Sequence, residues 1–137
     1  MTEATTAGEP AVTELEEPTL ERYFRTFNAG QFEATAQLSH PDGVLQPPLD
    51  DPQAGRTAIA AYLNAEAQGM QAYPRQATLE ASDGHGVRVG GYVQTPLLGV
   101  NVAWVFSLLP DGQIARAEIK LLAALQELFE RGAAPTG

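Results

Sequence analysis

Apolar residues recur every three or four positions in the first half of the chain and every second position in the second half. The first helical stripe predicts a helix from Pro18-Thr19 to the stop at Asn28-Ala29-Gly30, with Leu20, Tyr23, Phe24 and Phe27 on one side. A short second helix has Phe32, Ala36 and Leu38 as its apolar side. A third, over residues 56–68, has a stripe that ends near the stop residue Gly69.

The alternating pattern that follows Gly69 predicts strands over residues 72–82, 87–95, 100–109 and 114–121. Short turns between them favour antiparallel pairing, and Gly90-Gly91 indicates a bulge or a bend. Earlier in the chain, residues 39–43 are typical of a turn, and residues 44–46 form a brief strand that Pro47-Pro48 ends. A last helix is predicted over residues 121–130.

These elements predict an α+β domain over residues 18–132, with three N-terminal helices packed on a curved, mainly antiparallel sheet and a C-terminal helix. A strongly twisted sheet curls, and helices packed in its hollow leave a cavity at one end. Residues 1–17 hold five glutamates and no basic residue, which predicts a disordered acidic leader. Residues 133–137 are expected to be a frayed tail.

Charge and composition exclude several classes of protein. The net charge of −9 disfavours nucleic acid and anionic membrane surfaces as partners. The chain has no cysteine, no apolar stretch long enough to span a membrane and no secretory signal pattern, so we expect a cytoplasmic protein. No metal site is predicted, because His40 and His85 lie in separate turn clusters. Asp50-Asp51 is typical of helix capping rather than of a catalytic pair.

Tyr23 and Trp104 are the candidate binding residues. Trp104 is the only tryptophan and shares a strand face with Val102 and Phe106. An indole provides a single N–H donor and no acid–base chemistry, so such a site holds a ligand oxygen without moving a proton. From the residues alone, packing in the core remains the more ordinary role for both side chains.

The order of elements resembles the nuclear-transport-factor-like or SnoaL-like superfamily, which includes the ketosteroid isomerases. Its recurrent features are similar to Phe27-Asn28-Ala29-Gly30, Asp42-Gly43-Val44 and Gly55-Arg56-Thr57-Ala58-Ile59. In an isomerase, a carboxylate base works beside an oxyanion hole of a tyrosine and a protonated aspartate. By this resemblance the tyrosine falls on Tyr23, the aspartate on Trp104 and the base on Pro47, so no catalytic residue is predicted.

Residues 18–132 also resemble the carotenoid-binding C-terminal domain of orange carotenoid protein and its stand-alone homologues. The similar stretches are Gly43-Val44-Leu45-Gln46-Pro47-Pro48, Ala65-Glu66-Ala67-Gln68, Val93-Gln94-Thr95-Pro96, Asn101-Val102-Ala103-Trp104 and Leu121-Leu122-Ala123. The resemblance implies that Tyr23 and Trp104 donate hydrogen bonds to the ring carbonyl of a ketocarotenoid such as canthaxanthin or echinenone. It also implies a homodimer around one pigment, exchange with helical carotenoid proteins and a part in photoprotection.

The predicted function is therefore a non-enzymatic carrier that holds, stores or transfers a ketocarotenoid in an apolar tunnel. The alternative is a SnoaL-like or ketosteroid-isomerase-like enzyme acting on a small keto substrate. A carboxylate close to Tyr23 and Trp104 in the folded cavity would favour that alternative. The loop Leu97-Leu98-Gly99 departs from the photoactive relatives, which have an aromatic residue there.

Overall fold

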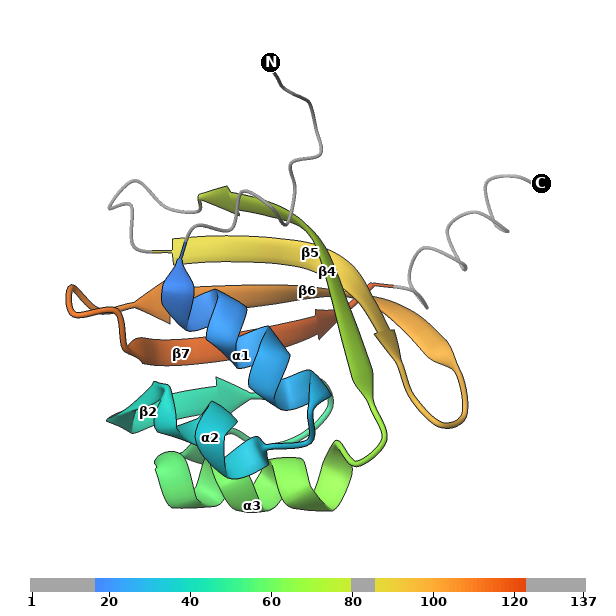
Figure 1. The fold of residues 1–137 in the computed structure, drawn as a ribbon, viewed down its shortest axis with the longest axis horizontal. Helices are drawn as coiled ribbons and strands as arrows, with labels where there is room; N and C mark the ends of the chain where they lie inside the picture. The colour runs from blue at the N-terminus through green and yellow to red at the C-terminus, as the bar shows by residue number, and fades with distance from the viewer. Residues whose placement is uncertain (1–16, 80–85, 123–137) are drawn as a thin grey trace.

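A computed structural model describes residues 17–79 and 86–122, and this part of the chain contains three helices and six strands. The helices are α1 (Pro18–Asn28), α2 (Phe32–Gln37) and α3 (Arg56–Glu66). The strands are β2 (Ser39–Gln46), β3 (Gln53–Ala54), β4 (Gln71–Leu79), β5 (Gly86–Gln94), β6 (Gly99–Leu108) and β7 (Ile114–Leu121). The sheet curves around α1, and α2 and α3 lie together beside β2 (Figure 1). The predicted α+β architecture is confirmed.

The strands form one mixed sheet in the order β3-β2-β7-β6-β5-β4. Four neighbouring pairs are antiparallel, as predicted, and the β2–β7 pair is parallel. In that pair Leu45 is opposite Ala117, so a strand from the first third of the chain lies beside the last described strand. This pairing joins the helical layer to the antiparallel strands.

The first helix forms where the apolar stripe predicts it. Pro18 occupies the first turn, where its missing N–H removes no helical hydrogen bond. Glu21 near the N-terminus and Arg25 near the C-terminus both complement the helix dipole. The residues that α1 buries include Leu20, Tyr23 and Phe24, so this stripe faces the hollow of the sheet.

Several predicted boundaries need correction. Helix α3 ends at Glu66 rather than at Gln68. Strand β2 begins at Ser39 rather than at Val44, because Ser39 already pairs with Ile114 of β7 before the register shifts. Strand β3 was not predicted, since two residues are too few to show a period. Leu121 ends β7 and does not open a helix.

The predicted leader, the frayed tail, the remainder of the C-terminal helix and His85 lie outside the described residues. The alternating pattern of β6 is confirmed within them. Val102, Trp104, Phe106 and Leu108 are all buried on one face, and Phe106 is fully enclosed. This face of β6 packs against α1 in the core.

The glycine pair of β5 lies opposite an irregularity in β4. The pairing register shifts between Pro74, opposite Gly91, and Gln76, opposite Gly90, so the predicted bulge is present and its extra residue belongs to β4. A Cβ atom at Gly91 would collide with the carbonyl oxygen of Tyr73 and lie 3.0 Å from the Trp104 ring. At Gly90 a Cβ atom would meet nothing within 4 Å.

We therefore expect Gly91→Ala to lower the free energy of unfolding by about 1–3 kcal/mol through overpacking. Gly90→Ala is the matched control, and its effect should be neutral or stabilising by up to about 1 kcal/mol. Urea denaturation of both variants measures the difference. Equal stability of the two variants would contradict the close packing of the Tyr73 carbonyl and the Trp104 ring against Gly91.

Candidate ligand-binding cavity

A cavity of about 330 Å³ opens between α1, α3 and the concave face of the sheet. This volume is at the lower end of the range for small-molecule sites. Most of the wall is apolar, and includes Phe27, Leu63, Met70, Val93, Val100 and Ile119. The cavity is therefore suited to a guest with a mainly hydrocarbon surface.

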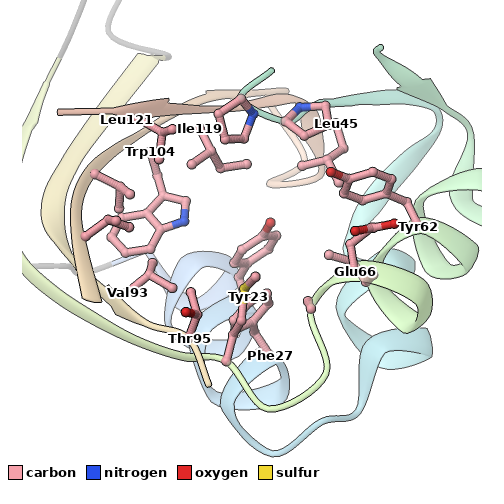
Figure 2. A pocket seen from close by; sticks show the side chains of 17 residues that line it. Tyr23, Phe27, Leu45, Tyr62, Glu66, Val93, Thr95, Trp104, Ile119 and Leu121 are labelled. Atoms are coloured by element: carbon pink, nitrogen blue, oxygen red, sulfur yellow. The ribbon is translucent and has the colours of Figure 1, made fainter. Parts of the chain in front are cut away.

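Tyr23 and Trp104, the two residues singled out in the sequence, line this same cavity. Tyr23 projects from α1 and Trp104 from β6, and each side chain is only 5 % exposed. Figure 2 shows the phenol oxygen and the indole nitrogen both pointing into the central space. The fold thus brings together two donors that are 81 positions apart in the sequence.

Neither donor has an acceptor in the described part of the chain. Within residues 17–79 and 86–122, no hydrogen bond is formed by the Tyr23 hydroxyl or by the Trp104 indole N–H. A buried donor without a partner costs about 1–3 kcal/mol, and most buried polar groups in native proteins are paired. An acceptor atom supplied by a guest would remove this cost.

Aromatic contacts hold the two donors in place. Phe24 packs edge-to-face on Trp104, with ring centroids 4.8 Å apart, and Phe106 packs in the same way on Tyr23 at 5.1 Å. Phe24 also contacts Tyr23 and Phe106, at 5.5 and 6.0 Å. Edge-to-face pairs of this kind contribute about 0.5–1.5 kcal/mol each beyond burial. The cluster connects α1 to β6 directly behind the donors.

Burial also fixes the protonation state of Tyr23. Removal of the phenol from water raises the pKa of Tyr23 well above its ordinary value of 10.0, because the charged phenolate is disfavoured in an apolar environment. The hydroxyl therefore remains protonated at neutral pH. It acts as a donor and not as a base.

The opposite wall of the cavity is more polar. Tyr62 and Glu66 of α3 lie across the space from Trp104 (Figure 2). The Tyr62 hydroxyl donates a 3.0 Å hydrogen bond to the Oδ2 atom of Asp50, and burial together with this contact raises the pKa of Tyr62 to about 12. Glu66 is exposed at the mouth.

Tyr62 and Glu66 line the cavity although they were not among the candidate binding residues. Tyr62 belongs to the predicted apolar stripe of α3, so its place beside the hollow follows from the helical period. Glu66 lies within the stretch Ala65-Glu66-Ala67-Gln68 that carries the family resemblance, and it adds a carboxylate to the wall. Pro47, at the position that resembles the isomerase base, lines the cavity and has no ionisable group.

Thr95 is a polar lining residue whose hydroxyl is already occupied. Its Oγ1 atom donates to the carbonyl oxygen of Leu98 and accepts from the N–H groups of Leu97 and Leu98. It thus closes the β5–β6 turn. Among the described lining residues near Trp104, the side-chain polar atoms without a hydrogen-bond partner are therefore the two donors.

Neither a cluster of metal-ligating side chains nor a membrane-spanning helix is found in the described part of the chain. Over residues 17–79 and 86–122, no group of three or more His, Asp or Glu side chains is placed to hold a metal ion. No helix in those ranges combines the length and the apolar character needed to cross a bilayer.

A curved cone of this topology with an apolar cavity defines the nuclear-transport-factor-like class of folds. The family model of the SnoaL-like domain matches residues 20–117, and the chain belongs to this family. Within it, the chain is homologous to the C-terminal domain of orange carotenoid protein. It is 36% identical over 117 residues to the orange carotenoid-binding protein of Synechocystis sp., a match that covers 81% of this chain and 37% of the relative.

Solved structures give the same assignment. The orange carotenoid protein of Anabaena (Nostoc) sp., solved with canthaxanthin bound, matches with a TM-score of 0.74 and 38% identity over 82% of this chain and 38% of that chain. A putative polyketide cyclase from Sinorhizobium meliloti matches with a TM-score of 0.62 and 25% identity over 74% and 93% of the two chains. The chain spans little more than a third of the length of its curated relatives, and its fold is shared with cyclases.

The raised pKa of Tyr23 predicts a loss of stability in alkali. As the pH rises past 10.0, the unfolded chain releases the Tyr23 proton and the folded chain keeps it, so the free energy of unfolding falls. Tyr23→Phe has no such proton and should lose less stability over the same range. Urea denaturation at several pH values on either side of 10.0 measures the slopes.

Trp104→Phe is the control for this measurement, because it alters the same cavity without removing a titrating group. It should keep the alkaline slope of the original protein, to which Tyr62 also contributes in both cases. If Tyr23→Phe kept the same slope as well, the buried placement of the phenol would be wrong.

Proposed function

We propose that this protein is a non-enzymatic carrier that binds a ketocarotenoid, of the canthaxanthin or echinenone type, for storage or transfer in photoprotection. The Tyr23 hydroxyl and the Trp104 N–H would donate to the ring carbonyl oxygen. The observation that carries the proposal is the pair of buried donors that have no acceptor among residues 17–79 and 86–122 and point into one apolar cavity. The homologous protein solved with canthaxanthin adds support.

Apolar burial and the two hydrogen bonds would play different parts in binding. Two neutral hydrogen bonds contribute about 0.5–1.5 kcal/mol each, whereas each buried CH₂ group contributes about 0.8 kcal/mol. Affinity for a long polyene would therefore come mainly from the apolar wall. The two donors would fix the position of the ring and draw electron density toward the carbonyl, which shifts absorption to the red.

Canthaxanthin is the pigment for the first test, either produced in the expression host or added to the purified protein. We expect a coloured protein with an absorption maximum to the red of the free pigment. Tyr23→Phe and Trp104→Phe should each shift that maximum to the blue, and the double variant should shift it further or lose the pigment. Absorption spectroscopy measures both effects.

Tyr62→Phe is the matched control, since Tyr62 lines the same cavity but its hydroxyl is bonded to Asp50. This variant should keep the absorption maximum of the original protein. Colourless protein from a host rich in ketocarotenoid would refute carriage. An equal blue shift in Tyr62→Phe would refute the assignment of the donors.

The size of the cavity favours a homodimer. A domain of this length has a radius of gyration of about 14 Å, so an extended carotenoid is roughly as long as the domain is wide. A cavity of about 330 Å³ would hold one ring and the adjoining part of the polyene. Leu97 and Leu98, 91 and 55 % exposed, follow the lining residue Thr95, and a second copy could cover them together with the protruding pigment.

We expect Leu97→Glu to weaken the pigment-loaded dimer by at least about ten-fold, because burial of a leucine contributes about 1.5–3 kcal/mol. Leu79→Glu is the control: Leu79 is 75 % exposed and lies at the far end of β4 from Gln71. Sedimentation of the canthaxanthin-loaded protein gives the dissociation constants. Equal effects of the two variants would place the interface elsewhere.

In this proposal the protein acts in the cytoplasm and exchanges its pigment with helical carotenoid proteins. A second candidate function is an enzyme that acts on a small keto substrate. The carboxylate of Glu66 on the cavity wall favours this alternative, since it faces the space into which the two donors point. Turnover of an enone that is lost in Glu66→Gln would favour catalysis over carriage.

A further inference from the structure

The end of α1 is hydrogen-bonded to the first residues of β4. The Asn28 side chain donates from Nδ2 to the carbonyl oxygen of Ala72 at 2.9 Å, and its Oδ1 atom accepts from the N–H of Ala72 at 2.7 Å. Gln71 adds a third bond, from Nε2 to the backbone oxygen of Asn28 at 2.9 Å. We call these three hydrogen bonds the Asn28 joint.

The joint occupies an otherwise unpaired edge. Strand β4 is the last strand of the sheet, and Ala72 is opposite Val93 on the inner side. The amide of Asn28 therefore takes the place of a further strand at this residue. Because Ala72 is only 2 % exposed, loss of the Asn28 side chain would leave a buried N–H and a buried carbonyl without partners.

The joint also connects the two elements that hold the donors. Tyr23 lies on α1, roughly 7.5 Å along the helix axis from Asn28, and Trp104 lies on the sheet. The buried Thr26–Thr35 bond ties α1 to α2 and not to the sheet. The aromatic contacts behind the donors connect α1 to β6, and the joint adds directional hydrogen bonds between the end of α1 and the sheet.

We infer that Asn28 is a positioning residue that sets where the Tyr23 hydroxyl lies relative to the Trp104 N–H. A bidentate amide fixes both the rotation and the axial position of the last turn of α1, and the rigid helix passes this constraint to Tyr23. The inference rests on the proposed function, because the geometry of the two donors matters through the carbonyl that they share.

The test compares canthaxanthin-loaded variants by their absorption maxima. Asn28→Ala should shift the maximum to the blue by no more than Tyr23→Phe does, and should weaken pigment binding by no more than the roughly five-fold that one neutral hydrogen bond supplies. In the Tyr23→Phe background, Asn28→Ala should cause no additional shift. Gln71→Ala removes one of the three hydrogen bonds of the Asn28 joint. We expect it to shift the absorption maximum to the blue by less than Asn28→Ala does.

Asn64→Ala is the matched control, since Asn64 also bonds to a backbone oxygen, that of Ala60, but within α3. It should leave the maximum unchanged. A purely structural role for Asn28 would lower the melting temperature and leave the spectrum of the folded protein as it was. An unchanged spectrum of folded Asn28→Ala would overturn the inference. So would a full additional shift of the absorption maximum when Asn28→Ala is added to Tyr23→Phe.

A second measurement tests the inference on the pigment-free protein. Trp104 is the sole tryptophan, and Phe24 of α1 packs against its ring, so its fluorescence reports how α1 lies on the sheet. Asn28→Ala should change the emission and increase quenching by acrylamide, whereas Asn64→Ala should not. Unchanged emission in Asn28→Ala would overturn the inference. Failure of the original protein to bind canthaxanthin would instead refute the proposed function.

Discussion

The main physical constraint on this structure is the burial of two hydrogen-bond donors that have no acceptor among the described residues. Tyr23 and Trp104 are each 5 % exposed in a wall that is otherwise mostly apolar. At position 23, stability alone would favour phenylalanine, since its ring fills similar space and has no unpaired hydroxyl. An acceptor atom placed in the cavity would complete the hydrogen bonds of both donors.

The surrounding fold maintains this arrangement from two sides. Phe24 and Phe106 support the donors in the core, while Asn28 joins the end of α1 to the sheet edge. Gly91 allows the Trp104 ring to lie close to β5. Sites that must hold a defined geometry are normally supported in this way by neighbouring side chains with fixed rotamers. These neighbours therefore hold both donors in a defined position.

Local periodicity was sufficient to predict much of this architecture. The stripe of α1 and the alternation of β6 correctly placed Tyr23 and Trp104 on inward-facing surfaces, and the family resemblance joined them into one candidate site. Their shared cavity depends on how the sheet curves, which no local pattern encodes. Glu66 was missed because an exposed helical glutamate looks the same whether it borders a cavity or bulk solvent. The parallel β2–β7 pair was missed for a similar reason: register between distant strands is not visible in either one.

The parallel pairing of β2 with β7 also has a consequence for synthesis of the chain. Apart from the two-residue strand β3, β2 has β7 as its neighbour in the sheet, and β7 leaves the ribosome about seventy residues later. The helices and β2 would therefore expose apolar surface until the remaining strands have been translated. Contacts between residues so far apart in the sequence slow folding and lengthen the time during which this apolar surface is exposed. Chaperones that bind exposed apolar surface are most needed in that interval.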